Sequence, residues 1–464
     1  MSLKNLVDEV NNVDLLVLHP NRLSARRLAD ALGCKQAIEC PVPPPEGLIR
    51  FGAASGVEGR RFTVNPRSAI ANLRDPTALY RLHRLPYGTR KGIGRTLTLH
   101  VVDGQVIALQ SKDTFSKMER QKSLALALRA LYLAGADFGA VDLAVPVRGA
   151  PRVTKVTTAP LLTVELASAY GRAIVPLIER KRRGAGQGGS AGGSSAGEAM
   201  AVGGDGSPPG ASAPLTLGAD PEFMFKHTQT GKLVPANRFF PTEGPIGCDR
   251  RKAIAEIRPD PQTEARDLTQ SIGSLLAGAA KKVRKKPVRM LAGAMPFSQF
   301  PIGGHIHFGG LSLTFPLLRA LDNYLLIPLF LVERGDAAIR RRKYYGYIGD
   351  VRLKAPGRFE YRSPSSWLVS PAITLSTLSL AKLIGEQAAR LPRNLFADRA
   401  ACRAFYEGDK DYFRRRIVAL RRDLESLPGY EAVAGDILPL WRLIEEGREW
   451  DDEVDLRQVW RIEP

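Results

Sequence analysis

The segment GGHIHFGG, residues 303–310, holds two of the six histidines in a chain of 464 residues. Alternate side chains of a β-strand point to opposite faces. A strand here therefore places His305 and His307 on one face, with Ile306 and Phe308 on the other. Glycines on both sides leave room for a ligand to approach the backbone closely. The segment predicts a strand with an apolar face toward a core and an imidazole face toward a ligand.

Three other segments of the C-terminal half show the same alternation: GADPEFMF (218–225), KAIAEIRPDP (252–261) and GRFEYRSPSSWL (357–368). Their polar faces carry acids and arginines: Asp220, Glu222, Glu256, Arg258, Arg358, Glu360 and Arg362. A solvated face is the ordinary explanation for any one such strand. Four strands with acid or imidazole pairs, each bounded by Gly or Pro, favour a shared site on one concave sheet.

Carboxylates gathered at this density repel one another unless cations lie between them. Oxygen ligands of this kind suit Mg²⁺ or Mn²⁺, which in turn bind phosphates. The arginines and histidines would neutralise charge on a transferred phosphoryl group. Zinc is the alternative for His305 and His307, although the sequence shows no obvious third ligand for it.

The chain is strongly basic, because Lys and Arg exceed Asp and Glu by 67 − 47 = 20. The excess is concentrated in runs such as KKVRKK (281–286), RRRK (340–343) and RRR (414–416). Such a surface favours polyanions, including nucleic acid, or simply reflects solvated helix faces. No known nucleic-acid-binding motif supports the first explanation. The sequence contains no apolar run of about 20 residues, so no membrane span is expected, and the N-terminus predicts a cytoplasmic protein.

Residues 184–214 are almost entirely Gly, Ala, Ser and Pro, which is typical of a flexible linker. The expected organisation is an N-terminal domain (1–180), a linker (181–214) and a C-terminal domain (215–464). Beyond residue 370 the apolar spacing predicts helices, packed behind the sheet or forming an appended bundle.

The motifs GADPEF, AEIRPDP, GGHIHFG and FEYRSPSSWL, in this order, resemble those of the phage-type (type 2) carboxylate–amine ligases, or amidoligases. The resemblance covers roughly 215–385. These enzymes are grouped with glutamate–cysteine ligase and glutamine synthetase, so it implies an α+β fold whose site lies on a curved antiparallel sheet with packed helices. It also implies amide formation, in which a carboxylate takes the γ-phosphoryl group of ATP and an amine then displaces phosphate.

The resemblance also implies roles for individual residues. The metal ligands would be Asp220, Glu222, Glu256 and Glu360. His305 and His307 would contact metal or ATP phosphates, and Arg362 would steady the moving phosphoryl group. Arg258 would contact substrate or phosphate, and Arg352, within YYGYIGDVRLKAPG (344–357), would contact nucleotide. These roles agree with the chemistry read from the strand faces, because clustered acids and an arginine stabilise an activated intermediate electrostatically.

The N-terminal region resembles the end of an ATP-grasp domain, an α/β fold, over residues 137–174. Asp142 matches the first acidic position of that family, but Lys155 and Thr157 occupy the positions of a Glu and an Asn. The resemblance therefore implies a degenerate domain without catalysis, which binds a substrate or partner or serves a structural role.

Two other functions remain open at this point: a basic nucleic-acid-binding module and a scaffold, each with a non-catalytic ligase-like core. The sequence does not select the carboxylate and amine substrates, and a phage or prophage setting is implied by the resemblance alone.

Overall fold

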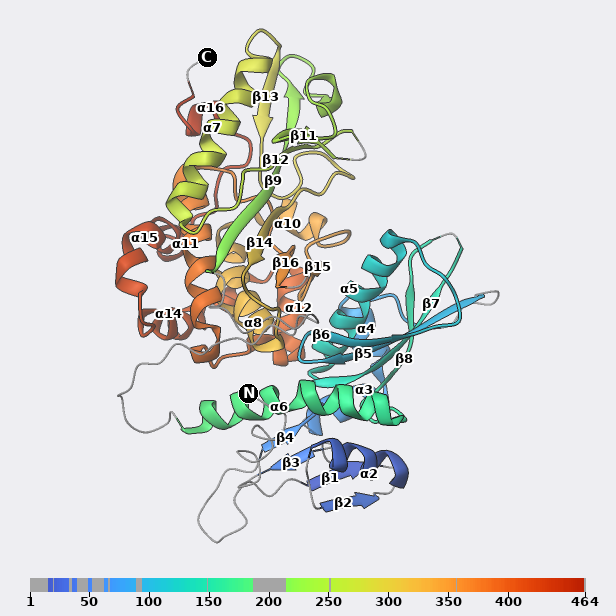
Figure 1. Ribbon diagram of the computed structural model, residues 1–464. Coiled ribbons are helices and arrows are strands. Elements are labelled where there is room, and N and C mark those ends of the chain that lie inside the picture. The colour runs from blue at the N-terminus through green and yellow to red at the C-terminus, as the bar shows by residue number, and fades with distance from the viewer. Residues whose placement is uncertain are drawn as a thin grey trace. The chain divides into compact units, whose positions relative to one another are not determined.

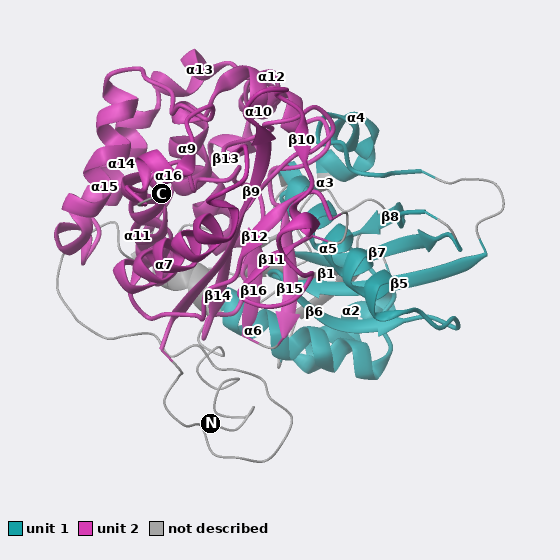
Figure 2. Ribbon diagram, turned by 90° about the horizontal axis from the view of Figure 1, so that it is seen from above, with its two compact units in different colours: residues 1–196 teal, residues 197–464 magenta. Residues whose placement is uncertain are grey.

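In the computed structural model the described residues are 16–19, 21–32, 36–39, 49–51, 62–65, 67–88, 94–147, 149–186, 214–249, 252–355 and 357–462. The chain forms two compact units, residues 1–196 and 197–464 (Figure 2). Helix α6 (Val164–Gly186) continues past residue 181, so the start of the predicted linker is helical. Its remainder, 187–213, lies outside the described residues.

The first unit contains two four-stranded sheets, with strand orders β2-β1-β3-β4 and β6-β5-β7-β8. The strands are β1 (Leu16–His19), β2 (Gln36–Glu39), β3 (Ile49–Phe51), β4 (Phe62–Val64), β5 (Arg95–Val102), β6 (Gln105–Gln110), β7 (Phe138–Val145) and β8 (Arg152–Thr157), and the helices besides α6 are α2 (Arg22–Ala31), α3 (Arg67–Arg74), α4 (Pro76–Leu82) and α5 (Lys117–Ala134). The turn between β5 and β6 is formed by Asp103 and Gly104, both with positive φ, as expected for an Asp-Gly hairpin.

Asp142 lies on β7, directly opposite Lys155 of β8. Thr98 Oγ1 donates a hydrogen bond to Asp142 Oδ1 at 2.7 Å. The acid that matches the ATP-grasp pattern is thus paired across the ladder with a lysine. That this domain is degenerate, and what role it has, both stay predictions.

The second unit is built on an eight-stranded sheet with the order β11-β12-β9-β14-β16-β15 (Figure 1). Its strands are β9 (Thr216–His227), β10 (Leu233–Val234), β11 (Ile246–Cys248), β12 (Ala255–Ile257), β13 (Val288–Leu291), β14 (Gly304–Gly309), β15 (Val351–Ala355) and β16 (Arg358–Tyr361). These strands pair in antiparallel fashion, and β10 and β13 also pair with β9. The four segments predicted as strands all contribute to this sheet, which confirms a mixed fold of helices and antiparallel sheets.

The apolar face of the sheet packs against helices. Phe223, Phe308 and Phe359 are fully buried, and Phe308 stacks on Phe359 with ring centroids 4.9 Å apart. A Cβ placed at Gly385 of α11 would lie 3.3 Å from the Phe308 ring, so this helix covers the apolar side. The helices are α7 (Ala265–Val283), α8 (Phe315–Ala320), α9 (Ile327–Val332), α10 (Gly335–Arg341), α11 (Pro371–Gln387), α12 (Arg399–Glu407), α13 (Lys410–Arg414), α14 (Ile417–Glu425), α15 (Tyr430–Glu445) and α16 (Leu456–Val459).

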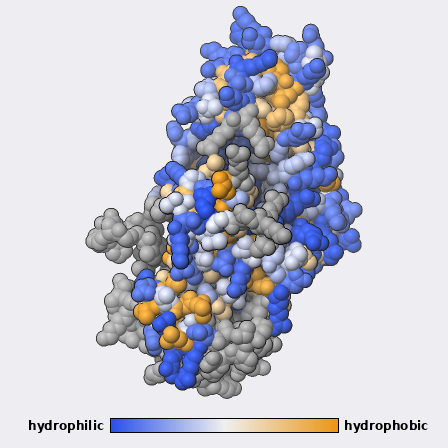
Figure 3. Space-filling model, turned by 90° about the vertical axis from the view of Figure 1, so that its right-hand side faces the viewer, coloured by the Kyte–Doolittle hydropathy of each residue, from blue (hydrophilic) through white to orange (hydrophobic). Residues whose placement is uncertain are grey.

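A π-helical turn, Leu321–Leu326, joins α8 to α9. Within the described residues, the combined segment Phe315–Val332 is long and apolar enough to cross a membrane, but 89% of it is buried inside the protein, as in a core helix. On the face drawn in Figure 3, hydrophilic residues predominate and apolar side chains form smaller patches.

Two of the basic runs contribute less surface charge than the sequence suggests. Arg341 and Arg342 of the RRRK run are buried, and Arg342 pairs with Glu333 and lies over the Phe330 and Phe405 rings. In the RRR run Arg414 pairs with Asp411 at 2.8 Å. The basic side chains of KKVRKK, in contrast, are all exposed.

Candidate active site

Strand register aligns the predicted site residues across the polar face of the second unit's sheet. Residues directly opposite each other in antiparallel strands project to the same face. The opposed pairs are Glu256 with Glu222, Asp220 with His305, His307 with Glu360, and Glu360 with Arg352. The structure therefore brings side chains from five strands, β12, β9, β14, β16 and β15, into one row.

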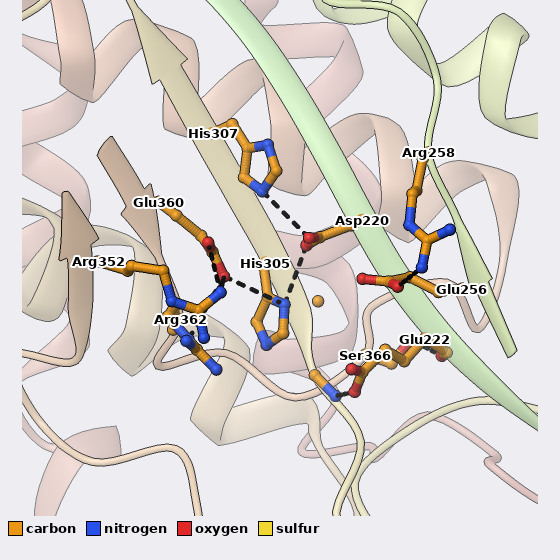
Figure 4. A network of polar contacts seen from close by, with 12 residues as sticks. Asp220, Glu222, Glu256, Arg258, His305, His307, Arg352, Glu360, Arg362 and Ser366 are labelled. Carbon is orange, nitrogen blue, oxygen red and sulfur yellow. Dashed lines mark hydrogen bonds and ion pairs between the residues drawn. The ribbon is translucent and has the colours of Figure 1, made fainter. Parts of the chain in front are cut away.

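Asp220 lies between the two histidines (Figure 4). Its Oδ1 is 2.9 Å from Nδ1 of His305, and its Oδ2 is 3.2 Å from Nε2 of His307. Burial by itself raises the pKa of Asp220, but the charges and hydrogen bonds of both imidazoles outweigh it and hold that pKa well below its ordinary value. Burial lowers the pKa of His305, and the charge and hydrogen bond of Asp220 together with the charge of Glu222 more than reverse this, so the net shift is upward. The pair is thus arranged to carry opposite charges.

Glu222 and Glu256 form the acidic side of the site. Burial, together with the charges of Glu256 and Asp220, raises the pKa of Glu222 to about 7, although His305 and a 2.7 Å hydrogen bond from the Gly303 amide oppose the shift. The pKa of Glu256 is also raised, by burial and by Asp220, despite its ion pair with Arg258. Negative charge is therefore incompletely compensated here.

On the other side of the site, which we call the cationic side, three positive side chains surround the carboxylate of Glu360. Its side chain is fully buried, and its oxygens lie 3.1 Å from Arg352 Nη1, 2.6 Å from Lys354 Nζ and 3.4 Å from Arg362 Nε. Three cations around one carboxylate make this end of the row rich in positive charge. Lys354 was not among the predicted site residues. Reading VRLKA as a strand would have found it, because alternation places Lys354 on the face of Arg352.

Arg258 is already engaged within the protein. It pairs with Glu256, and its Nη1 donates to the carbonyl oxygens of Thr242 and Gly244 at 3.2 Å. A Cβ at Gly247 would collide with this guanidinium, so any other residue there would require the Arg258 side chain to move. The predicted contact of Arg258 with substrate or phosphate stays a prediction.

Residues that follow α10 lie over the cationic side. The Tyr345 ring centroid is 5.0 Å from Arg362 and 5.9 Å from the His305 ring.

Arg341, the last residue of α10, donates from Nε to the carbonyl of Ile302 at 2.7 Å, and from its two Nη atoms to those of Ser363 and Pro364 at 2.9 and 2.8 Å. One buried guanidinium thus joins the segment before β14 to the segment after β16.

The glycines before the histidines serve the protein's own packing. A Cβ at Gly303 would lie 2.5 Å from Nε2 of His305, and one at Gly304 would collide with the Trp367 indole. The expectation that these glycines leave room for a ligand is wrong at these two positions. His305 and Trp367 fill that space.

The explanation of the polar face as an ordinary solvated surface is also wrong. Asp220 and His305 are only 9% and 5% exposed, and Glu360 is fully buried. Burial of ionised groups costs free energy unless each is paired. Such a cluster is typical of a functional site.

The donor set fits divalent cations. Ligand atoms within 4.8 Å of one another come from Asp220, Glu256 and His305, and in a second group from Asp220, His307 and Glu360. Both groups use Asp220, so two neighbouring ions would share this carboxylate. Carboxylate oxygens outnumber imidazoles, which favours Mg²⁺ or Mn²⁺. The objection that zinc lacks a third ligand no longer holds, because each histidine has two carboxylates beside it.

Comparisons with solved structures found distant likenesses. A bifunctional glutathione synthetase from Pasteurella multocida is 9% identical with a TM-score of 0.32, over 54% of this chain and 48% of that one. The complex of the prokaryotic ubiquitin-like protein Pup with its ligase PafA gives 10% identity and a TM-score of 0.32, over 50% of this chain and 65% of that one. The chain thus spans less than two thirds of either structure. These likenesses are too distant to assign a reaction.

No curated protein matches the chain. The family model described as phage phiEco32-like COOH.NH2 ligase-type 2 matches residues 217–462, which is more than half of the chain and includes every site residue described above. The chain belongs to this family of carboxylate–amine ligases.

Proposed function

We propose that the second unit is an ATP-dependent carboxylate–amine ligase that forms an amide through an acyl phosphate. One observation carries this proposal: the row of opposed side chains from Glu256 to Arg352 places an acid-rich region beside a cation-rich one. The first suits divalent cations, and the second suits the phosphate groups and carboxylates of the substrates. The related curved-sheet architecture of glutamine synthetase and glutamate–cysteine ligase is part of the same proposal.

In the first step a substrate carboxylate oxygen attacks the γ-phosphorus of ATP. The bond from that phosphorus to the β–γ bridging oxygen breaks, and ADP leaves. Arg362 would stabilise the transferring phosphoryl group, and Arg352 and Lys354 lie beside the same Glu360 carboxylate. The Arg362 side chain is only 13% exposed, so its charge would act where electrostatic stabilisation is stronger than in water; Arg352 and Lys354 are each more than a third exposed.

In the second step the amine nitrogen attacks the acyl carbon. The carbon–oxygen bond to phosphate breaks, inorganic phosphate leaves and the nitrogen loses a proton. An acyl phosphate hydrolyses if water reaches it. Tyr345, whose ring lies beside Arg362 and His305, would help to exclude water from it. His305 and His307 would contact phosphate oxygens or hold the metal ligand Asp220 in place.

Asp220, Glu222, Glu256 and Glu360 would hold Mg²⁺ or Mn²⁺. When bound, these ions neutralise phosphate charge and polarise the phosphoryl group. The raised pKa of Glu222 supports this assignment, since burial and the neighbouring charges of Glu256 and Asp220 disfavour the ionised carboxylate that a bound cation would stabilise. In the absence of a cation the site retains a proton instead.

The first unit would then bind a substrate or a partner without catalysing a step, as its degenerate ATP-grasp pattern implies. When a mixture of amino acids and amines is supplied with ATP and Mg²⁺, mass spectrometry should detect a product whose mass equals that of one carboxylate plus one amine less one water.

The test compares Glu360→Gln with Glu425→Gln. Glu425 lies on α14 and pairs with Arg421, away from the sheet's polar face. Substrate-dependent phosphate release should fall at least about 100-fold in Glu360→Gln, equivalent to about 2.7 kcal/mol of transition-state stabilisation, and stay near wild type in Glu425→Gln. Thermal melting shows whether each variant folds. Undiminished turnover in a folded Glu360→Gln protein would exclude this site.

A further inference from the structure

An open groove of about 840 Å³ runs along α7 in the second unit, outside the row of site residues. It is bounded by α7, the start of α11 and the chain around α16, which lie beside one another in Figures 1 and 2. Its lining includes three small residues of α7, Gly273, Ser274 and Ala277. The proposed ligase chemistry does not use it.

The groove is lined by cations and by no acidic residue among the described part of the chain. Its basic residues are Arg266, Lys281, Arg284 and Arg461, all of them exposed. Arg266 shares its charge with Asp436, 2.8 Å away. No ion pair with another described residue engages the other three, so their charge is available to a ligand. Lys282, Lys285 and Lys286 extend the exposed positive surface past the end of the groove.

Trp460 supplies an aromatic wall. Its Nε1 donates to the carbonyl of Leu368 at 2.9 Å, which fixes the plane of the indole. A Cβ at Gly273 would lie 3.2 Å from the indole Cζ3, so the ring rests against the bare backbone of α7. The ring is half-buried and lines the groove with its remaining surface.

We propose that this groove binds single-stranded nucleic acid. Lys281, Arg284 and Arg461 would contact phosphates, together with polar groups such as Gln270, and a base would stack on Trp460. An acidic peptide would use the same cations, but it would gain nothing from the indole face. The combination of a fixed aromatic ring with unpaired cations therefore favours the nucleic acid. This site is independent of the proposed ligase reaction.

The experiment measures binding of the full-length protein to a fluorescent mixed-sequence DNA 12-mer by anisotropy, at several salt concentrations and without ATP. Lys281→Glu/Arg284→Glu should weaken binding at least about 10-fold and reduce the salt slope by roughly 1.4, which is about 0.7 for each phosphate of a single strand that the protein no longer neutralises. Lys285→Glu/Lys286→Glu makes the same change in net charge just outside the groove, and should weaken binding at most about 3-fold.

Trp460 provides the second arm. Trp460→Leu should weaken binding several-fold without changing the salt slope, whereas Trp460→Phe should stay close to wild type, because it keeps an aromatic face. Melting curves confirm that each variant is folded. The proposal is overturned if the oligonucleotide does not bind, if the two double variants lose affinity equally, if a folded Trp460→Leu binds like wild type, or if oligoglutamate of equal charge binds as tightly.

Discussion

Asp220 and His305 face each other across β9 and β14, and one hydrogen bond of 2.9 Å joins Oδ1 of the acid to Nδ1 of the imidazole. The other oxygen of the same carboxylate lies 3.2 Å from His307. Asp220 is also common to both groups of side chains able to hold a metal ion. It is therefore the residue on which the cation-binding part of the proposed site depends.

Asp220→Asn should abolish stabilisation by divalent cations. A ligand at 100 times its dissociation constant stabilises a protein by about 2.7 kcal/mol, so the wild-type melting temperature should rise when Mn²⁺ or Mg²⁺ replaces EDTA. The variant should show no such rise, because both groups of ligands lose a charged oxygen. Asp411→Asn, an exposed acid paired with Arg414, is the matched control. An equal rise in Asp220→Asn would place the ions elsewhere.

Glu222→Gln should stabilise the metal-free protein at neutral pH. Folding raises the pKa of Glu222 from 4.5 to about 7, so the folded state binds more protons than the unfolded state between these values and loses stability as pH rises through them. A difference of 7 − 4.5 = 2.5 corresponds to roughly 3 kcal/mol. Urea unfolding in EDTA measures the free energy of unfolding. The value for the variant minus that for wild type should increase from pH 4.5 to 7 and stay constant above pH 7.

The control for that series is Glu425→Gln, which should show no such gain over the same pH range. Adding Mg²⁺ should reduce the difference in the free energy of unfolding between Glu222→Gln and wild type, because only the wild-type protein has the ionised carboxylate that a bound cation stabilises. A variant less stable than wild type at pH 8 in EDTA would show that Glu222 is satisfied without a cation.

Lys354→Met should lower kcat/KM for ATP by about 10- to 100-fold, because one of the three cations beside Glu360 is removed. Lys354→Arg keeps the charge and should recover most of the activity. Lys343→Met, at an exposed lysine outside the row, is the matched control. Steady-state phosphate release against ATP concentration provides the measurement. Equal activity of Lys354→Met and wild type would reduce Lys354 to a structural partner of Glu360.

Gly303→Ala should impair catalysis much more than Gly309→Ala, although both glycines flank the same histidines. The added methyl at 303 would meet His305 Nε2, whose ring is held by Asp220, and must displace it. At 309 the nearest atom is the Thr216 hydroxyl, on a side chain that can rotate away. The ratio of the two variants' phosphate-release rates, with melting curves as a check on folding, measures the difference. Similar rates would show that the position of His305 is unimportant.

Alternation within each segment was enough to predict which side chains share a face, as Asp220 and Glu222 illustrate. It does not specify which strands are neighbours, because pairing depends on contacts between distant parts of the chain. The opposition of His307 to Glu360 became visible only through the register of β14 and β16. A mixed fold with antiparallel sheets could thus be predicted from the sequence, together with the faces on which the candidate residues lie, whereas the order of the row and the presence of Lys354 in it were not predicted.

The buried arginines show a different limit. RRRK looks like a charged surface run, and nothing in its composition distinguishes Arg341 and Arg342 from Arg340, which is exposed and pairs with Asp336. The buried Arg341 donates to the carbonyls of Ile302 and Ser363, 39 and 22 residues away in the chain, and the buried Arg342 pairs with Glu333. Composition alone therefore overstated the surface charge at this run.

Arg341 has a mechanical consequence for the second unit. Its guanidinium holds three carbonyl groups that precede β14 and follow β16, and unpaired buried carbonyls are costly. The two strands can separate at these ends only if Arg341 gives up either its bond to Ile302 or its two bonds to Ser363 and Pro364, so we expect them to behave as one cooperative unit of local unfolding. The amide hydrogens of Ile306 and Tyr361, which lie opposite each other on the two strands, should therefore exchange with solvent through the same opening event. Their exchange rates should change by the same factor when denaturant is added.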